Sequence, residues 1–238
     1  MLERAGQVLF RWRSFTPVPL VVAAVPLLWR SRGPAHWAWL AAGLLLCVLG
    51  QALRAWVLGQ VPDGTSGQNE ALIATQLNTR GPYAHTRNPL YLGNLGITLG
   101  LCLVAHDPLL LALTAALFGL QYRAIIAAEE GFLRGQFGAA YDAYCARVPR
   151  FWPRLGEAGS IGSFNWRRAL KKEHNPAASW LLLCVLLKAR DSRGPWWPYA
   201  LAFGILVALW LCVKGWKHAW LSGGFTSDLR RRLRETAR

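Results

Sequence analysis

Two charged groups, about forty positions apart, carry side chains that can bind a ligand with both a carboxylate and an amine. The first is Arg87, and the second is the adjacent pair Glu129 and Glu130. An arginine binds a carboxylate through charge-assisted hydrogen bonds, and a glutamate binds an ammonium group in the same way. Tyr91 follows Arg87 by about one helical turn and adds a hydroxyl group. These residue types predict a site for a ligand of mixed charge.

The elements that must position these groups are two apolar segments, residues 89–105 and 108–128. Only His106 and Asp107 separate them, and such a short connection predicts an antiparallel helical hairpin. Arg87 precedes the first segment and the glutamates follow the second, so both groups must emerge on the same side of the membrane. The sequence therefore predicts that they meet in space.

Both groups also have a structural interpretation. Glu129 and Glu130 suit a polar helix end near water, and Arg87 suits an arginine that extends to the membrane interface. The hairpin favours a functional interpretation, because it gathers a cation, two carboxylates and Tyr91 in one place. Arg54 lies toward the end of another apolar run. We interpret it as a structural residue whose side chain extends to the membrane interface.

The composition is that of a membrane protein. Of the 238 residues, 53% are hydrophobic, yet Lys and Arg outnumber Asp and Glu by 27 to 12. The basic residues lie in clusters between long apolar runs, which predicts a membrane partner and no nucleic acid. Four of the five cysteines lie inside apolar runs, and none are paired at metal-ligand spacing. We therefore interpret the cysteines as small hydrophobic residues and predict no metal site.

The hydrophobic pattern predicts an all-α, multi-pass transmembrane protein with about five to six spans. Besides the hairpin, residues 15–29, 36–58 and 195–216 have the length or composition of spans. Residues 177–189 are apolar but number only 13. They cross a bilayer core of about 30 Å only if their helix begins earlier, near Phe164.

The distribution of charge predicts the orientation. With six spans, 20 Lys and Arg fall in the loops on the side of the termini, and five fall in the opposite loops. Because positive loops stay in the cytoplasm, both termini and the Arg87 unit are predicted to be cytoplasmic. The basic run at 230–234 is expected to meet acidic lipid head groups.

The pattern also divides the chain into an N-terminal pair of spans, a central core, and C-terminal spans with a basic tail: residues 1–59, 60–156 and 157–238. Within the core, residues 70–77 are predicted to form a short helix on the membrane surface. Residues 131–148 have helical spacing and are predicted to form one further helix, ended by Pro149.

Several ordered blocks of the core resemble the integral-membrane methyltransferases, which include isoprenylcysteine carboxyl methyltransferase and the phospholipid N-methyltransferases. The blocks are Gly81-Pro82-Tyr83, Arg87-x-Pro89-x-Tyr91-x-Gly93, Glu129-Glu130, Phe137-Gly138-x-x-Tyr141-x-x-Tyr144 and Val148-Pro149-Arg150-Phe151-x-Pro153. The resemblance covers about residues 75–154, a third of the chain. The order of the blocks carries it, since any one of them alone is a weak signal.

The resemblance implies a cytoplasm-facing pocket for S-adenosylmethionine, with a lipid or prenyl group entering laterally between helices. It implies catalytic roles for Arg87 and Glu130, and His85, which lies close in the sequence, is a further catalytic candidate as a base. The cofactor-binding residues that it implies are Tyr83, Arg87, Asn88, Pro89, Tyr91, Gly93, Glu129, Glu130 and Arg150.

The chain departs from the family pattern at one position, where Arg87-Asn88-Pro89 stands in place of the usual Arg-His-Pro. Asparagine donates and accepts hydrogen bonds as a neutral histidine does, but it takes no proton near neutral pH. Asn88 replaces the histidine if that residue only forms a hydrogen bond. If a base is needed, His85 lies three residues upstream.

The predicted function is S-adenosylmethionine-dependent methyl transfer to a membrane-embedded lipid or to a prenylated or apolar small molecule. A carboxylate or thiolate acceptor needs no base, whereas an amine or hydroxyl does. The scarcity of candidate bases favours an acceptor that is already anionic. Two alternatives stay open: a nicotinamide-dependent membrane reductase of the sterol-reductase type, and a non-catalytic protein with the same fold.

Overall fold

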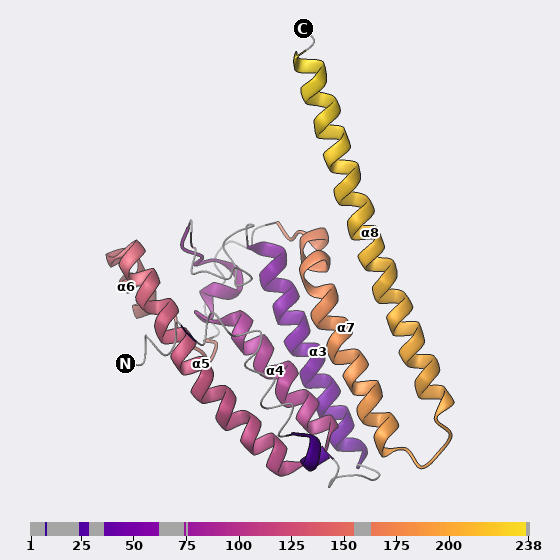
Figure 1. Cartoon of the computed structure of the whole chain (residues 1–238). Coiled ribbons are helices and arrows are strands. Elements are labelled where there is room, and N and C mark those ends of the chain that lie inside the picture. Colours follow the sequence, from indigo (N-terminus) through magenta and orange to yellow (C-terminus); the bar gives the residue numbers. More distant parts are fainter. Residues whose placement is uncertain are drawn as a thin grey trace.

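The computed structural model describes residues 8, 24–28, 36–61, 74, 76–154 and 163–236, with side chains as far as 217. Every regular element in this part of the chain is a helix, which confirms the all-α prediction (Figure 1). In chain order the elements are α3 (Trp37–Gln60), the 3-10 turn η1 (Gly81–Ala84), α4 (Pro89–Val104), α5 (Pro108–Phe137), α6 (Ala139–Arg147), α7 (Trp166–Asp191) and α8 (Trp197–Thr236).

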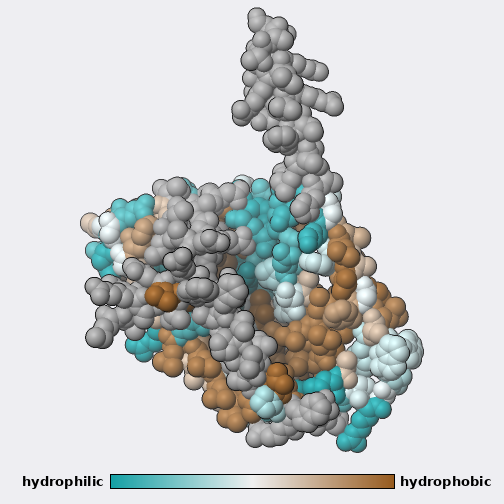
Figure 2. Space-filling model, in the orientation of Figure 1, coloured by the Kyte–Doolittle hydropathy of each residue, from teal (hydrophilic) through white to brown (hydrophobic). Residues whose placement is uncertain are grey.

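Three of the described helices are long and apolar enough to cross a membrane: Trp37–Gln60, Pro108–Phe137 and Trp197–Lys217. Helix α4 is apolar but shorter, at 16 residues. Large hydrophobic side chains are exposed along the three long apolar helices, as expected of surfaces that face lipid. Figure 2 shows hydrophobic residues gathered over the middle and lower part of the molecule, with hydrophilic residues above them.

Helix α7 begins earlier than its apolar half, as a span would require, but it is not among the three described helices that are apolar enough to cross a membrane. It begins at Trp166 and continues for 26 residues without a break, so its length is about 39 Å. Its first half is charged, and the apolar residues follow Pro176. The predicted first span over residues 15–29 lies outside the described residues except for 24–28, which are helical.

The predicted hairpin of α4 and α5 is confirmed. Both helices begin with a proline at the first position, where a missing N–H has no effect on the helix. His106 adopts a left-handed conformation with φ of 48°, and the carboxylate of Asp107 accepts a hydrogen bond from the Leu110 N–H at 2.9 Å. This cap starts α5 directly after the turn.

Two predicted boundaries within the core are wrong. Helix α5 does not stop near residue 128 but continues to Phe137, because nothing before Gly138 breaks it. Gly138 then adopts a φ of 51°, which glycine tolerates, and α6 follows as a separate helix. Of the predicted surface helix at 70–77, residues 74, 76 and 77 are not helical, and the others lie outside the described residues.

Helices α3 and α4 pack closely through glycines. A Cβ atom added at Gly50 would lie 2.6 Å from the carbonyl oxygen of Gly93, and one at Gly43 would lie 2.7 Å from that of Gly100. Small residues at such contacts allow two membrane helices to approach backbone to backbone. The start of α4, which carries the candidate site, is therefore fixed against α3.

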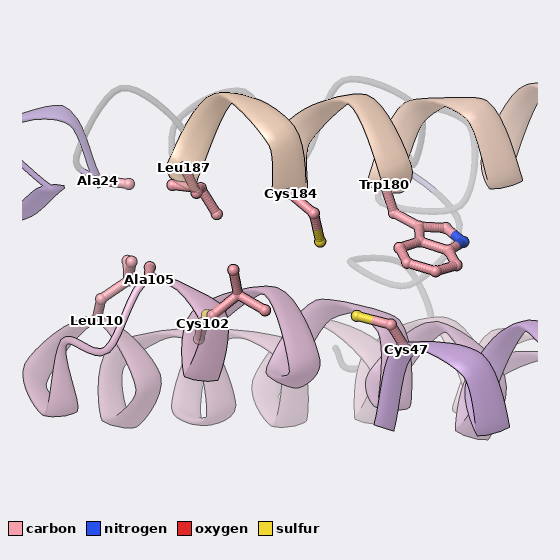
Figure 3. Packing of buried hydrophobic residues seen from close by; sticks show 9 residues of the cluster. Ala24, Cys47, Cys102, Ala105, Leu110, Trp180, Cys184 and Leu187 are labelled. Carbon is pink, nitrogen blue, oxygen red and sulfur yellow. The ribbon is translucent and has the colours of Figure 1, made fainter. Parts of the chain in front are cut away.

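Helix α7 covers the other side of this pair. Figure 3 shows Trp180, Cys184 and Leu187 pointing from α7 toward Cys47 and Cys102, with which they form the buried apolar cluster. The start of α7 is also attached to the end of α3, since the Asn165 N–H donates to the Gly59 carbonyl at 2.8 Å. Helix α7 is thus part of the bundle that supports the site.

Candidate functional site

The predicted meeting of the two charged groups is confirmed by an ion pair between Arg87 and Glu130. Arg87 precedes α4 and Glu130 lies in α5, and the Arg87 Nη1 atom is 3.1 Å from Glu130 Oε1. Both side chains are largely buried, at 13% and 7% exposure. The short turn of the hairpin brings these two elements together at the polar end of the helices.

Glu130 holds a second arginine. The guanidinium of Arg150 donates from Nε to Glu130 Oε1 at 3.0 Å and from Nη2 to Oε2 at 2.5 Å. Hydrogen bonding to Glu130 raises the pKa of Arg150 above its ordinary value. The prediction that Glu130 lies at a helix end near water is wrong, because α5 continues past it and leaves it buried.

Glu129 has a different partner. Its Oε1 atom accepts a hydrogen bond from the Tyr91 hydroxyl at 2.6 Å. Successive residues of an α-helix point about 100° apart, so two adjacent glutamates cannot face the same arginine. The pair therefore divides: Glu130 faces Arg87 and Arg150, and Glu129 faces α4.

The segment before α4 is paired with the segment after α6. The Arg87 N–H donates to the Pro149 carbonyl at 2.9 Å, and the Asn88 side-chain amide donates to the Arg150 carbonyl at 2.7 Å. The buried hydroxyl of Thr86 donates to the Phe151 carbonyl at 2.8 Å. These bonds bring Arg150 to the site, and they give Asn88 the role of a neutral hydrogen-bond donor.

His85 lies at the edge of this paired region. Its Nδ1 atom is 3.0 Å from the Arg154 carbonyl, and its own carbonyl accepts from the Arg154 N–H at 3.0 Å. A carbonyl only accepts, so Nδ1 carries the proton and Nε2 is the basic nitrogen of the neutral ring. A catalytic role for His85 stays a prediction.

Buried tyrosines of α6 close the site on one side. Tyr144 donates its hydroxyl proton to the Tyr83 carbonyl at 2.7 Å, and Tyr141 is 2% exposed. Burial raises the pKa of Tyr83, Tyr141 and Tyr144 above the ordinary value of 10.0. Nearby carboxylates add to the pKa shifts of Tyr83 and Tyr141. These phenols are therefore neutral donors at physiological pH.

Two predicted cofactor contacts lie at packing positions. Pro89 is the buried first residue of α4. Gly93 faces α3, where an added Cβ would lie 2.6 Å from the Arg54 side chain. A cofactor contact for either residue stays a prediction.

Sequence reasoning missed several residues around the site. They are Thr86, which accepts a hydrogen bond from the Asn88 N–H, Tyr144, which donates to the Tyr83 carbonyl, and Cys145, whose sulfur lies against the Arg87 guanidinium. Tyr144 stands within a recognised block, which is the signal that was available. The interface interpretation of Arg54 is also wrong, because its side chain is 13% exposed and pairs with Glu173 at 2.7 Å.

The donor set fits an amino-acid group such as the polar end of S-adenosylmethionine. Among the described residues the buried Arg87 Nε atom has no hydrogen-bond partner, so a donor is left that a carboxylate could satisfy. Arg150 is 55% exposed and can also be reached. Glu129 adds an acceptor for an ammonium group. Within the described ranges, no group of three His, Cys, Asp or Glu side chains is placed to hold a metal ion.

Comparison with known proteins bears on the family of this chain. Residues 38–140 match the family model described as phospholipid methyltransferase, which confirms the predicted resemblance to integral-membrane methyltransferases. This range contains α3, the α4–α5 hairpin and both glutamates, while Arg150 and α7 lie beyond it.

Two curated relatives are named as resistance proteins. The chain is 34% identical over 142 residues to the nickel-cobalt-cadmium resistance protein NccN of Alcaligenes xylosoxydans xylosoxydans, which covers 57% of this chain. It is 33% identical over 147 residues to the cobalt-zinc-cadmium resistance protein CzcN of Cupriavidus metallidurans, which covers 60% of this chain. The chain spans 62% of the length of each relative. No solved structure matches it significantly.

Proposed function

We propose that this protein transfers a methyl group from S-adenosylmethionine to a membrane-embedded lipid or to a prenylated or apolar small molecule. The observation that carries the proposal is the gathering of Arg87, Arg150 and Glu129 around the buried Glu130, at the polar end of an apolar hairpin. Such a site binds a charged cofactor where an acceptor held in lipid can reach it. We place this end of the hairpin in the cytoplasm, as the charge distribution predicts.

The four side chains have separate roles in this proposal. Arg87 and Arg150 would hold the carboxylate of the cofactor, since arginine presents several donors in a planar fork. Glu129 would hold the ammonium group. Glu130 would position both arginines, because Arg150 donates to both of its oxygens and the Arg87 guanidinium lies 3.1 Å from Oε1. The sequence left open which glutamate meets the ammonium group, and the geometry favours Glu129.

Bound S-adenosylmethionine supplies a methyl group on a sulfonium that is already activated. The protein's residues then have to align the reactants and exclude water, and alignment contributes much of the rate in such reactions. The hydrogen bond from the Tyr91 hydroxyl holds the Glu129 carboxylate in place. For an amine or hydroxyl acceptor, the free Nε2 of His85 is the candidate base, whereas an anionic acceptor needs none.

The names of the relatives suggest a setting for this activity. We propose that methylation of a membrane component by this protein contributes to tolerance of nickel, cobalt, zinc or cadmium. Growth of cells that produce the parent or Arg87→Gln, across a series of metal concentrations, tests the link. Tolerance that depends on Arg87 supports it, and equal tolerance contradicts it.

Calorimetry on the purified protein in detergent tests the cofactor. We expect S-adenosylhomocysteine to bind and NADPH not to bind, while binding of NADPH alone would favour the reductase alternative. Arg87→Gln should reduce the affinity about ten- to a hundredfold, because a charge-assisted hydrogen bond contributes about 1.5–3 kcal/mol. Arg147→Gln is the matched control, since Arg147 is exposed and bonds to the Ala143 carbonyl.

Mass spectrometry identifies the acceptor. Membrane extracts incubated with the parent and with isotopically methyl-labelled cofactor should yield a labelled apolar product, and Arg87→Gln should yield much less. Binding of S-adenosylhomocysteine without any labelled product would favour the non-catalytic alternative.

A further inference from the structure

A second charged cluster lies among α3, α4 and α7, next to the candidate site. It joins Arg54 of α3, Asn94 of α4 and Glu173 of α7. Glu173 of α7 is 4% exposed and accepts hydrogen bonds from the guanidinium of Arg54 at 2.7 and 2.9 Å. The side-chain amide of Gln51 donates to the same carboxylate at 2.5 Å. The Trp180 indole in turn donates to the Gln51 carbonyl at 3.0 Å. Burying charge inside a membrane bundle is unfavourable, so such clusters are retained where they serve a function.

The cluster continues toward the candidate site. Arg54 also donates to the side-chain oxygen of Asn94 on α4, and the Asn94 amide donates to the Tyr122 hydroxyl on α5 at 3.3 Å. The ring of Tyr122 meets the ring of Tyr91 edge to face, with 4.7 Å between the ring centroids. Tyr91 donates to Glu129. Side-chain contacts therefore run without a gap from α7 to the carboxylate of the site.

We infer that Arg54 and Glu173 are positioning residues of this site. Arg54 fixes the orientation of the Asn94 amide, which decides whether its N–H or its carbonyl faces Tyr122. Through Tyr122 and Tyr91, that orientation sets where Glu129 is held. Glu173 keeps the Arg54 guanidinium in place and neutralises its charge. The consequence for methyl transfer rests on the function proposed above.

The inference gives α7 a part in the site, although α7 lies outside the residues that match the family model. Arg54 and Asn94 lie within the matched residues and Glu173 does not. The matched core alone would thus hold a buried arginine without its carboxylate, which is strongly destabilising. Helix α7 is therefore needed to supply the carboxylate that neutralises Arg54.

A purely structural ion pair is the competing explanation, and a double variant separates the two. Arg54→Met with Glu173→Leu removes both charges and keeps the volume, and such replacements of buried pairs often preserve stability. The variant should therefore fold with a Tm near that of the parent. It leaves Asn94 without the bond that orients it.

Two readouts on the double variant decide the question. We expect the affinity for S-adenosylhomocysteine to fall about tenfold by calorimetry. We also expect the NMR signals of ¹³C-labelled Tyr91 and Tyr122 to shift in the ligand-free protein, with assignments taken from Tyr→Phe variants. Trp180→Phe is the matched control, because it removes a bond on the far side of Glu173. It should leave both tyrosine signals in place.

The outcomes are distinguishable from those of the proposed function. A folded double variant with unmoved tyrosine signals and parental affinity would overturn the inference. A parent that binds no S-adenosylhomocysteine would overturn the proposed function, and the ligand-free tyrosine signals would still decide the inference. If the double variant fails to fold, Glu173→Gln replaces it, since glutamine keeps the volume and an acceptor for Arg54 but removes the charge that holds the guanidinium. Shifted tyrosine signals in that variant support the inference, and unmoved signals contradict it.

Discussion

Glu130 and Glu173 are both buried glutamates that pair with arginines, yet their surroundings differ. Glu130 binds two arginines, of which Arg150 is 55% exposed. Among the described residues Glu173 pairs with one arginine, Arg54, whose side chain is 13% exposed, and it also accepts a hydrogen bond from Gln51. Water therefore reaches one ion-paired cluster and is largely excluded from the other.

The two clusters also differ in how completely their arginines are neutralised. Around Glu130 two guanidiniums share one carboxylate, which leaves donors of both arginines available to an anion, and the neighbouring Glu129 adds a negative charge to the site. Arg54 and Glu173 neutralise each other, and every polar nitrogen of Arg54 already has an acceptor. The first arrangement is suited to binding a ligand, and the second is suited to holding helices and side chains in place.

The largest effect expected from this contrast is on folding. Glu173→Ala leaves Arg54 buried without a counter-ion, so the free energy of unfolding should fall by about 3–5 kcal/mol. Thermal unfolding in detergent measures the change. Asp142→Ala is the control, because its ion pair with Arg134 is exposed at the surface and should contribute nothing measurable. Equal effects of the two variants would contradict the contrast.

The next effect separates the two adjacent glutamates. Glu129→Gln and Glu130→Gln should each weaken binding of S-adenosylhomocysteine about ten- to a hundredfold, as measured by calorimetry. Only Glu130→Gln should also lower Tm, because it leaves two arginines without their shared carboxylate. If Glu130→Gln binds as tightly as the parent, Glu130 does not position the arginines.

Part of this site could be predicted from the sequence. The two-residue connection at 106–107 and the prolines at the starts of both helices determine a hairpin, and a hairpin determines that Arg87 meets the glutamates. This inference needs only the number of residues in each segment and the direction of the chain. The length of the apolar runs likewise predicts that the chain spans a membrane.

The partners of individual side chains could not be predicted. Whether Glu129 or Glu130 faces Arg87 depends on the rotation of α5 about its axis, which side-chain packing decides. Arg54 and Glu173 are 119 positions apart, and a paired arginine has the same sequence signature as one that extends to the interface. Glu173 was nevertheless visible as a lone carboxylate within a basic stretch.

A smaller effect on stability is expected from Tyr144, one of the buried tyrosines of α6 that close the site on one side. Tyr144→Phe removes the hydrogen bond to the Tyr83 carbonyl, so stability at pH 7 should fall by about 0.5–1.5 kcal/mol. Burial raises the pKa of Tyr144 above 10.0, so the folded state favours the protonated phenol. That contribution is complete below pH 10 and is lost as the pH rises beyond it.

Chemical unfolding at pH 7, 9 and 11 measures this prediction. The parent should lose more stability than Tyr144→Phe between pH 9 and 11, because the variant has one buried phenol fewer to ionise. Tyr199→Phe is the control, since Tyr199 lies in α8 away from the site. Parallel pH profiles of parent and Tyr144→Phe would show that Tyr144 ionises as freely in the folded chain as in the unfolded chain.

The smallest effect is expected at Asn88, where the chain departs from the family pattern. Asn88 donates to the Arg150 carbonyl, and a neutral histidine at this position also has an N–H to donate. Asn88→His should therefore bind S-adenosylmethionine within a few-fold of the parent, and its methyl-transfer rate should show no new titration near pH 6.5. Asn88→Leu is the matched control without a donor, and its affinity should fall further because Arg150 loses a backbone contact. A parent that is inactive on every acceptor, beside an active Asn88→His variant, would show that the asparagine has removed a catalytic base and that Arg87, Glu129 and Glu130 now serve binding alone.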